Sequence, residues 1–239
     1  MGDGPNQIPK RTVDLVASPF GSAKKIFVSD FDGTITERDF YLLVGEHLLP
    51  DNIPDFWQLH LDGKISIFDV LAGIFASIEG DEARVMEVAR RAGIDPRFAS
   101  SVDRLRAGGW EVVVASIGCE WYIRRLLAEH GAEVTVFANP GRLLPGGGLE
   151  MKPLRDSPFA SEIAGVDKAA IVRAAGEQAD VVAFAGDSRP DYEAAMTVEP
   201  EYRFARHGLA EIFRRKGIPF RPFKRWTDIP AQLLGESDA

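Results

Sequence analysis

Short apolar runs that alternate with helical patterns constrain the fold of this chain more than any other feature. The runs of strand length cover residues 24–29, 111–115, 133–138, 180–185 and 201–205. Helices are predicted after three of them, at residues 119–130, 189–196 and 209–216. Strands interleaved with helices are typical of parallel strands joined by right-handed crossovers. We therefore predict an α/β fold with a doubly wound, mostly parallel sheet of the Rossmann type.

Polar side chains of chemical interest stand at or next to the ends of three of these runs. They are Asp30, Ser116 and Asp187. In doubly wound sheets, ligands bind beyond the carboxyl ends of the strands. The three side chains are therefore expected to share one site.

Two stretches interrupt the alternation. The first, residues 40–106, has little strand signal, and its apolar residues recur at helical spacing. Helices are predicted there at residues 41–49, 66–78 and 82–92. The predicted organisation is an N-terminal arm (1–23), an α/β core (24–39 and 107–239) and an inserted helical cap (40–106). The second stretch, 140–151, contains three consecutive glycines but no P-loop pattern, so a β-hairpin or a loose turn is expected.

Composition narrows the class of protein and of partner. The 239 residues are 45% hydrophobic and 27% charged, the balance of a globular protein with a real core. A net charge of −8 disfavours nucleic acid as the main partner, although local cations can still bind a small phosphorylated metabolite. A lone cysteine, Cys119, allows neither an intrachain disulfide nor a Cys-based zinc site.

Hydropathy adds an expectation about location. No apolar run approaches the roughly 20 residues that a membrane span needs, and the first residues lack the long apolar segment of a secretory signal. We therefore expect no membrane partner, and the lone cysteine makes a reducing cytoplasm the predicted location. The oligomeric state stays open.

An acid pair carries the strongest chemical signal. Asp30 and Asp32 are two residues apart where an apolar strand ends, and Gly33 follows. Because successive side chains of a strand alternate between its faces, residues i and i+2 can face one pocket. The alternative is an ordinary strand-end turn, for which Asp and Gly are common.

A hydroxyl forms the second signal. Ser116, Ile117 and Gly118 follow a very apolar strand, where a side-chain hydroxyl and backbone N–H groups at a helix start can bind a phosphate oxygen. Serine is also simply a good helix cap, so both interpretations stay open.

A lysine and a second acid pair complete the set. Lys168 stands near a predicted helix start, where its ammonium can neutralise phosphate or can simply be solvated. Asp187 follows the run at 180–185 and is placed to bind a metal ion. Asp191, four residues later, can bind metal, orient Lys168 or cap the next helix.

The order of these motifs resembles that of the haloacid dehalogenase superfamily of phosphohydrolases, over roughly residues 24–234. The resemblance implies that Asp30 attacks phosphorus and that Asp32 acts as general acid and then general base. It implies a Mg²⁺ ion held by Asp30, the backbone carbonyl of Asp32 and Asp187. Asp191 would add a ligand or orient Lys168.

The same resemblance also implies which residues bind the phosphate group of the substrate. Ser116, Ile117, Gly118 and Lys168 would bind its oxygens. The implied activity is hydrolysis of a phosphomonoester of a small metabolite through an aspartyl-phosphate, with Mg²⁺ as cofactor.

The insertion stands where the phosphoserine-phosphatase-like branch has its cap. Several stretches are similar to the methionine-salvage phosphatases that act on 2-hydroxy-3-keto-5-methylthiopentenyl-1-phosphate: residues 30–36, 63–67, 186–191 and 204–209. The chain departs from that family at residues 151–167, which lack the cysteine-rich segment of its bacterial members, and at 116–118, where Ser-Gly-Gly is expected. Phosphoserine, a sugar or cofactor phosphate and other phosphomonoesters therefore stay open as substrates.

Substrate contacts are predicted near the acid pair. Glu37 and Arg38 follow it directly and are candidates for contacts under the cap, with a solvated loop as the alternative. Four aromatic residues are candidates for an apolar pocket or for the packing of the cap itself: Phe40, Phe56, Trp57 and Phe68.

Three other functions fit parts of the pattern. A phosphotransferase would use the same aspartyl-phosphate with a second metabolite as acceptor. A receiver-type signalling domain also has a phospho-accepting Asp, Mg²⁺ and a Lys, but Asp32 and the helical insertion disfavour it. A scaffold that binds phosphate without catalysis is disfavoured because all the expected catalytic side chains are present.

Overall fold

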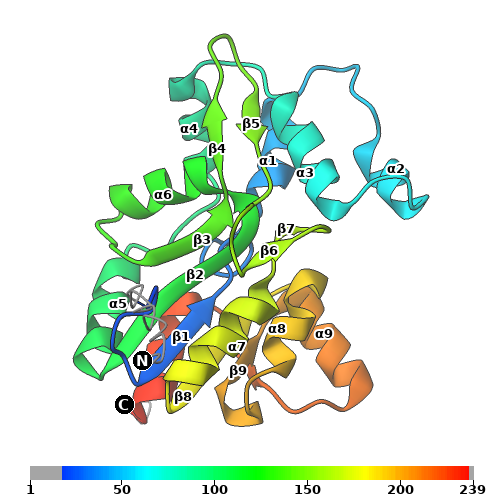
Figure 1. Ribbon diagram of the computed structural model, residues 1–239. Coiled ribbons are helices and arrows are strands. Elements are labelled where there is room, and N and C mark those ends of the chain that lie inside the picture. The colour runs from blue at the N-terminus through cyan, green and yellow to red at the C-terminus, as the bar shows by residue number, and fades with distance from the viewer. Residues whose placement is uncertain (1–17, 237–239) are drawn as a thin grey trace, which may run out of the picture.

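The computed structural model describes residues 18–236 and confirms the predicted α/β class. Six parallel strands form one sheet in the order β10-β9-β8-β1-β2-β3 (Figure 1). The strands are β1 (Lys25–Ser29), β2 (Trp110–Cys119), β3 (Thr135–Asn139), β8 (Val181–Gly186), β9 (Arg203–Ala205) and β10 (Arg221–Pro222). Most of the predicted arm (1–23) and the last three residues lie outside the described part of the chain.

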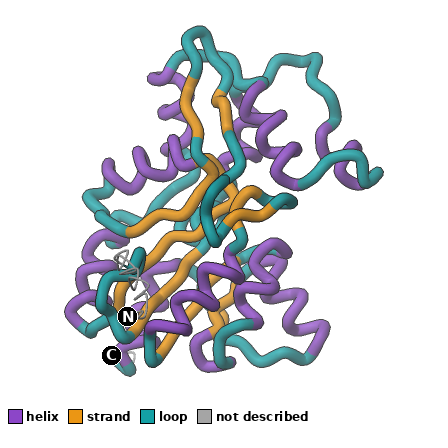
Figure 2. The backbone as a smooth tube through the Cα atoms, viewed as in Figure 1, coloured by secondary structure: helices purple, strands orange, loops and turns teal. Residues whose placement is uncertain are grey.

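Helices cover both faces of this sheet (Figures 1 and 2). One layer contains α7 (Lys168–Gln178), α8 (Tyr192–Met196) and α9 (His207–Lys216), and the other contains α5 (Phe98–Ala107), α6 (Glu120–Glu129) and α10 (Ile229–Leu234). Along β1, Ile26 and Val28 pack under the first layer and Phe27 packs under the second. Strands of a parallel sheet that is buried on both faces have continuous apolar sequences, which is why these strands can be recognised in the sequence.

Strand β2 is longer than its apolar run predicts. It continues through Ser116 to Cys119 instead of ending at Ala115, and its pairing with β3 shifts register between Ala115 and Cys119. Four residues of β2 there span the distance of two residues of β3. Ser116 therefore follows the last regularly paired residue, Ala115, as predicted. It lies inside β2, however, and not beyond the end of the strand.

Several short elements were not predicted. Helix α2 (Phe56–Leu61) is six residues long and has no fully buried residue. The predicted helix at 189–196 is divided into a 3₁₀ turn, Arg189–Asp191, and α8. Further 3₁₀ turns lie at Pro200–Tyr202 and Trp226–Asp228, and a small hairpin joins β6 (Ala160–Ser161) and β7 (Gly165–Val166).

The insertion between β1 and β2 projects from one end of the sheet (Figure 1). It contains α1 (Phe40–His47), α2, α3 (Ile67–Ala76) and α4 (Glu82–Arg90), whereas α5 packs on β2 and α10. The stretch at 140–151 is a β-hairpin, β4 (Gly141–Leu143) with β5 (Leu149–Met151), and it lies beside α3. No helix within residues 18–236 has the length and apolar character needed to cross a bilayer.

Candidate active site

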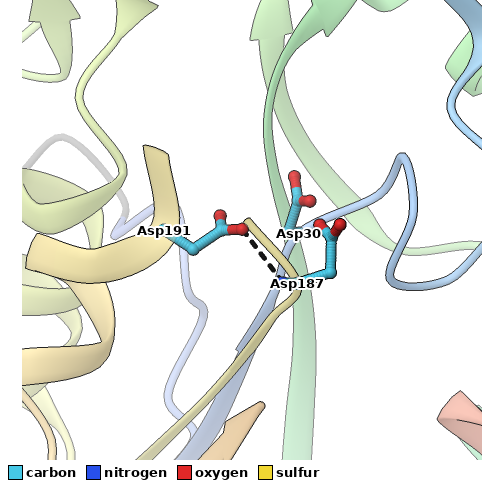
Figure 3. Close-up of side chains that lie close together, drawn as sticks. All are labelled: Asp30, Asp187 and Asp191. Carbon is cyan, nitrogen blue, oxygen red and sulfur yellow. Dashed lines mark hydrogen bonds between the residues drawn. The ribbon is translucent and has the colours of Figure 1, made fainter. Parts of the chain in front are cut away.

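The carboxyl ends of β1 and β8 bring two acidic residues together. These strands are neighbours in the sheet, and the Asp30 backbone N–H donates to the carbonyl of Ala185 at 2.9 Å. One carboxylate oxygen from each of Asp30, Asp187 and Asp191 lies within 4.8 Å of the other two. Figure 3 shows the carboxylates of Asp30 and Asp187 side by side, with Asp191 reaching in from the following turn.

Lys168, at the first turn of α7, is buried inside this acidic cluster. Its Nζ donates to Asp30 Oδ1 at 2.5 Å and to Asp191 Oδ1 at 2.7 Å. Only 5% of the residue is exposed, so the solvated-lysine interpretation does not apply. The ammonium therefore contacts carboxylates of two different loops at once.

Burial and mutual repulsion raise the pKa values of these acids. Burial, together with the Asp191 charge, raises the pKa of Asp30 to about 7 and that of Asp187 to about 9. Burial alone would lower the pKa of Lys168, but Asp191 and Asp30 raise it above its ordinary value. Three carboxylates around one ammonium leave an excess of negative charge, which a divalent cation would neutralise.

Asp191 has both oxygens engaged. Besides the ion pair with Lys168, its Oδ2 accepts from the backbone N–H groups of Asp187 at 3.1 Å and Ser188 at 3.0 Å (Figure 3). Gly186 leaves the space for it, since a Cβ there would be 2.6 Å from Asp191 Cβ. Asp191 is thus arranged to orient Lys168 and to fix the Asp187 turn.

Asp32 faces the same site and has hydrogen-bond partners of its own. Its Oδ1 accepts from the backbone N–H of Phe40 at 3.1 Å, and its Oδ2 accepts from the Tyr122 hydroxyl. Burial, followed by the nearby Asp39 charge, raises the pKa of Asp32 to about 7. A carboxyl that changes protonation near neutral pH can serve as both acid and base.

Residues 116–118 form the bulge near the end of β2, where Gly118 donates its backbone N–H to a neighbouring side chain. Ser116 is buried, and its Oγ accepts from the Gly118 N–H at 3.0 Å. The amide of Asn139 donates to the Ile117 carbonyl at 2.7 Å and holds this bulge in place. A Cβ on Gly118 would overlap the Tyr122 hydroxyl, so glycine is required beside the Tyr122–Asp32 contact.

A cavity of about 170 Å³ opens above these groups. Its floor consists of Asp30, Asp32, Lys168 and the bulge at 116–118, and Asp39 adds a carboxylate at the start of α1. The opposite wall comes from the insertion and is apolar and aromatic: Tyr41, Trp57, Ile67, Leu71 and Phe75. Lys168 is the one cation among the described residues that line the cavity.

Some predicted substrate residues lie elsewhere. Glu37 and Arg38 are exposed and are absent from the cavity lining, and Arg38 pairs with Glu46 on α1. Of the four predicted aromatics, only Trp57 lines the cavity. Phe40 is buried against Tyr122, with ring centroids 4.4 Å apart.

The sequence reasoning missed Asp39 and Tyr122. A signal for Asp39 exists, because an acidic residue directly before a helical pattern is a typical N-cap on the active-site side of that helix. Tyr122 carries no comparable signal. Its place in α6 predicts burial, but nothing local predicts that its hydroxyl reaches Asp32 across 90 residues.

Comparisons with known proteins identify relatives of this chain. The family model described as "haloacid dehalogenase-like hydrolase" matches residues 27–196. A 2-hydroxy-3-keto-5-methylthiopentenyl-1-phosphate phosphatase from Exiguobacterium sibiricum is 25% identical over 208 residues, covering 85% of this chain and 94% of that protein. A protein named Pdp3-interacting factor 1 from Schizosaccharomyces pombe is 29% identical over 225 residues, covering 88% and 95%.

Solved structures share the fold. A HAD family hydrolase from Salmonella enterica serovar Typhi superimposes with a TM-score of 0.67 at 16% identity, covering 90% of this chain and 72% of that one. Others of the similar structures are phosphoserine phosphatases. At these identities, the likeness establishes the fold.

Proposed function

Because this chain belongs to the haloacid dehalogenase-like hydrolase family and is a phosphatase, we propose that it hydrolyses a phosphomonoester of a small metabolite through an aspartyl-phosphate on Asp30. The observation that carries the proposal is the buried ion pair of Asp30 with Lys168, 2.5 Å apart, next to the Asp187 carboxylate. A carboxylate so placed can attack phosphorus while the ammonium offsets the repulsion between the two anions.

The proposed reaction has two steps. In the first, a carboxylate oxygen of Asp30 bonds to phosphorus and the bond to the leaving oxygen breaks, while Asp32 donates its proton to that oxygen. In the second, the Asp32 carboxylate accepts a proton from water, and the water oxygen displaces Asp30 from phosphorus. The pKa of about 7 at Asp32 supports this double role.

The donor set fits Mg²⁺. Oxygen ligands in a compact cluster suit this ion, and three buried carboxylates lie together here while only Asp30 and Asp191 pair with Lys168. We propose that Asp30, Asp187 and the backbone carbonyl of Asp32 hold it, and that Asp191 orients Lys168. When bound, Mg²⁺ supplies positive charge that offsets repulsion between the nucleophile and the phosphate. Ser116, the N–H groups at Ile117 and Gly118, and Lys168 would bind the phosphate oxygens.

The cavity wall supports an apolar leaving group over phosphoserine. The carboxylate of phosphoserine would need a cation, yet Lys168, the one cation in the described lining, is already paired with Asp30 and Asp191. Trp57, Leu71 and their neighbours instead offer apolar contact to an uncharged tail. We therefore propose an enol- or keto-sugar phosphate of the methylthiopentenyl kind as the preferred substrate class, with Asp39 accepting from a hydroxyl of the substrate.

The insertion is proposed to act as the cap that closes this cavity. Helices α1, α2 and α3 contribute its wall, and the β4–β5 hairpin supports α3 through the Gly148 N–H, which donates to the Ile78 carbonyl at 2.7 Å. Contacts of Glu37 and Arg38 with substrate would require a different position of their loop. A cytoplasmic location remains part of the proposal.

A phosphate-release screen tests the function. Purified protein with Mg²⁺ is incubated with apolar-tailed phosphomonoesters, phosphoserine and sugar phosphates, beside Asp30→Asn and the exposed control Asp103→Asn. We expect release without any added acceptor, highest kcat/KM for apolar-tailed esters, and loss only in Asp30→Asn. Release that persists in Asp30→Asn would contradict the nucleophile, and release that requires a second metabolite would indicate a phosphotransferase.

A further inference from the structure

Resting on the Mg²⁺ site proposed above, we propose that Arg206 is a positioning residue that fixes the spacing between the Asp30 and Asp187 loops. The observation is a single buried guanidinium that joins the acid-pair loop to a turn whose backbone holds the other metal-binding loop. Nothing in the two-step chemistry uses Arg206 directly, and it does not line the cavity.

The Arg206 side chain holds the acid-pair loop. It is 5% exposed, and its Nε donates to the Gly33 carbonyl at 2.6 Å. One terminal nitrogen donates to the Thr36 carbonyl, and the other donates to the Lys224 carbonyl at 2.8 Å. A planar guanidinium can direct donors to three carbonyls at once, which a lysine ammonium on a flexible stem cannot reproduce.

The backbone of the same turn holds the second loop. The Arg206 N–H donates to the Gly186 carbonyl at 3.2 Å, and the Leu209 N–H donates to the Asp187 carbonyl at 2.7 Å. Residues 206–209 therefore contact the loops on both sides of the acidic cluster. A displacement of this turn would move Asp187 relative to Gly33.

The two loops have little tolerance for such a displacement. A Cβ on Gly33 would be 2.6 Å from Asp187 Oδ2, so the loops are in direct contact. The Thr34 hydroxyl lies 3.3 Å from Asp30 Oδ2 and 3.2 Å from Asp187 Oδ1, between the two carboxylates. Mg²⁺ demands near-ideal octahedral geometry, so small changes in carboxylate spacing weaken its binding.

Arg203 provides a matched control three residues earlier. It is also 5% exposed, and it donates to the carbonyls of Ala195, Val198 and Pro219 at 2.7, 2.7 and 3.0 Å. None of these acceptors belongs to the acid-pair loop or to the Asp187 turn. The two arginines therefore make the same kind of contact, and only one of them makes it at the site.

The test compares Arg206→Lys with Arg203→Lys in the full chain. Calorimetry gives Tm with and without Mg²⁺, and phosphate release gives the Mg²⁺ concentration for half-maximal rate. Both variants are expected to melt at lower temperature than the parent without Mg²⁺. Only Arg206→Lys is expected to raise the half-saturating Mg²⁺ concentration, by about tenfold, and to shrink the rise in Tm that Mg²⁺ causes.

The outcomes separate this inference from the proposed function. If the Mg²⁺ response of Arg206→Lys equals that of Arg203→Lys, the positioning role is overturned while the proposed function stands. If Mg²⁺ changes neither the Tm nor the rate of the parent, the metal site and this inference both fail. Should Arg206→Lys be too unstable to purify, Arg206→Gln, which keeps a smaller planar donor, is measured and judged in the same way.

Discussion

The floor of the cavity and its opposite wall are built in contrasting ways. The floor lies at the carboxyl ends of core strands, and its charged groups are buried and paired: Lys168 with Asp30 and Asp191, and Asp32 with Tyr122. The wall comes from the insertion and is apolar, and part of it is loosely packed. Trp57 is 38% exposed, and α2, which carries it, has no fully buried residue.

Under the proposed function, this difference would separate the chemistry, at the floor, from the choice of substrate, at the wall. A buried ionic network allows little substitution, because removing one partner leaves another charge buried and unpaired. An apolar wall on short helices can change its shape at small cost, because such surfaces need only fill volume. We therefore expect changes in the floor to abolish turnover and changes in the wall to redirect it.

The largest effect is expected from Asp30→Asn. The variant keeps the shape of the side chain but removes the nucleophile, so kcat should fall by more than about 10⁴-fold. Phosphate release under saturating substrate measures it, with Asp103→Asn on α5 as the exposed control. A fall smaller than tenfold would mean that another residue is the nucleophile. It would also contradict the expectation that changes in the floor abolish turnover.

Asp32→Asn should produce the next largest loss. General acid–base catalysis contributes about 10²–10⁴-fold, and the amide can neither donate to the leaving oxygen nor accept a proton from water. A substrate with a good leaving group, such as p-nitrophenyl phosphate, should lose less in the first step because its departure needs no acid. Equal losses for good and poor leaving groups would contradict the acid role.

Trp57→Ala tests the wall. Removing a large apolar contact should raise KM for an apolar-tailed phosphomonoester by about tenfold, since full burial of a large apolar side chain is worth roughly 1.5–3 kcal/mol and substrate would cover only part of Trp57. The kcat for p-nitrophenyl phosphate should stay near that of the parent. Leu61→Ala, on the same helix but 77% exposed, is the matched control. An unchanged KM in Trp57→Ala would mean that the wall does not select the substrate.

The pH dependence of stability tests the crowding of the floor. Burial and Asp191 raise the folded-state pKa of Asp187 from 3.8 to about 9, so the folded protein binds more protons than the unfolded chain between these values. Stability without Mg²⁺ should therefore fall as pH rises from about 5 to 8. Calorimetry should show a lower Tm at the higher pH, and Asp187→Asn should reduce that slope. A Tm that rises over this pH interval in the metal-free protein would contradict the raised pKa of Asp187 among its neighbouring carboxylates.

The smallest effect is expected from Ser66→Ala at the start of α3. Ser66 and Asp69 form a capping box there, and loss of such a cap costs about 1 kcal/mol of stability. Denaturant unfolding should detect it, while kcat should change little because the floor is untouched. Ser100→Ala on α5 is the control, and a large loss of kcat in Ser66→Ala would show that wall and floor are not separable.

The sequence predicts the core better than the insertion, and the reason is physical. Strands buried on both faces are written as continuous apolar runs, so β1, β2 and β8 and the polar residues that follow them can be located from the sequence alone. A short helix such as α2, which buries no residue fully, leaves no such pattern. The register shift after Ala115 also depends on pairing with β3, which no local pattern encodes.

The candidate site was predictable where strand order decides it. Asp30 and Asp187 meet because parallel strands present their carboxyl ends at one edge, which the motif order already implied, and Lys168 reaches them from the start of α7. Tyr122 and Arg206 escaped because their roles depend on contacts between distant segments, such as the 90 residues that separate Tyr122 from Asp32. Asp39 was missed although its place before a helical pattern is a local signal. The exposed position of Glu37 and Arg38 likewise follows from the path of the loop into α1.

Trapping of a phosphorylated residue tests the central claim most directly. Asp32→Asn protein is mixed with p-nitrophenyl phosphate and Mg²⁺ and quenched in acid, and its peptides are analysed by mass spectrometry. The account predicts the mass of one phosphoryl group on the peptide that contains Asp30, and its absence in Asp30→Asn. A phosphoryl group on any other residue, or turnover in the parent with no phosphorylated peptide in Asp32→Asn, would contradict it.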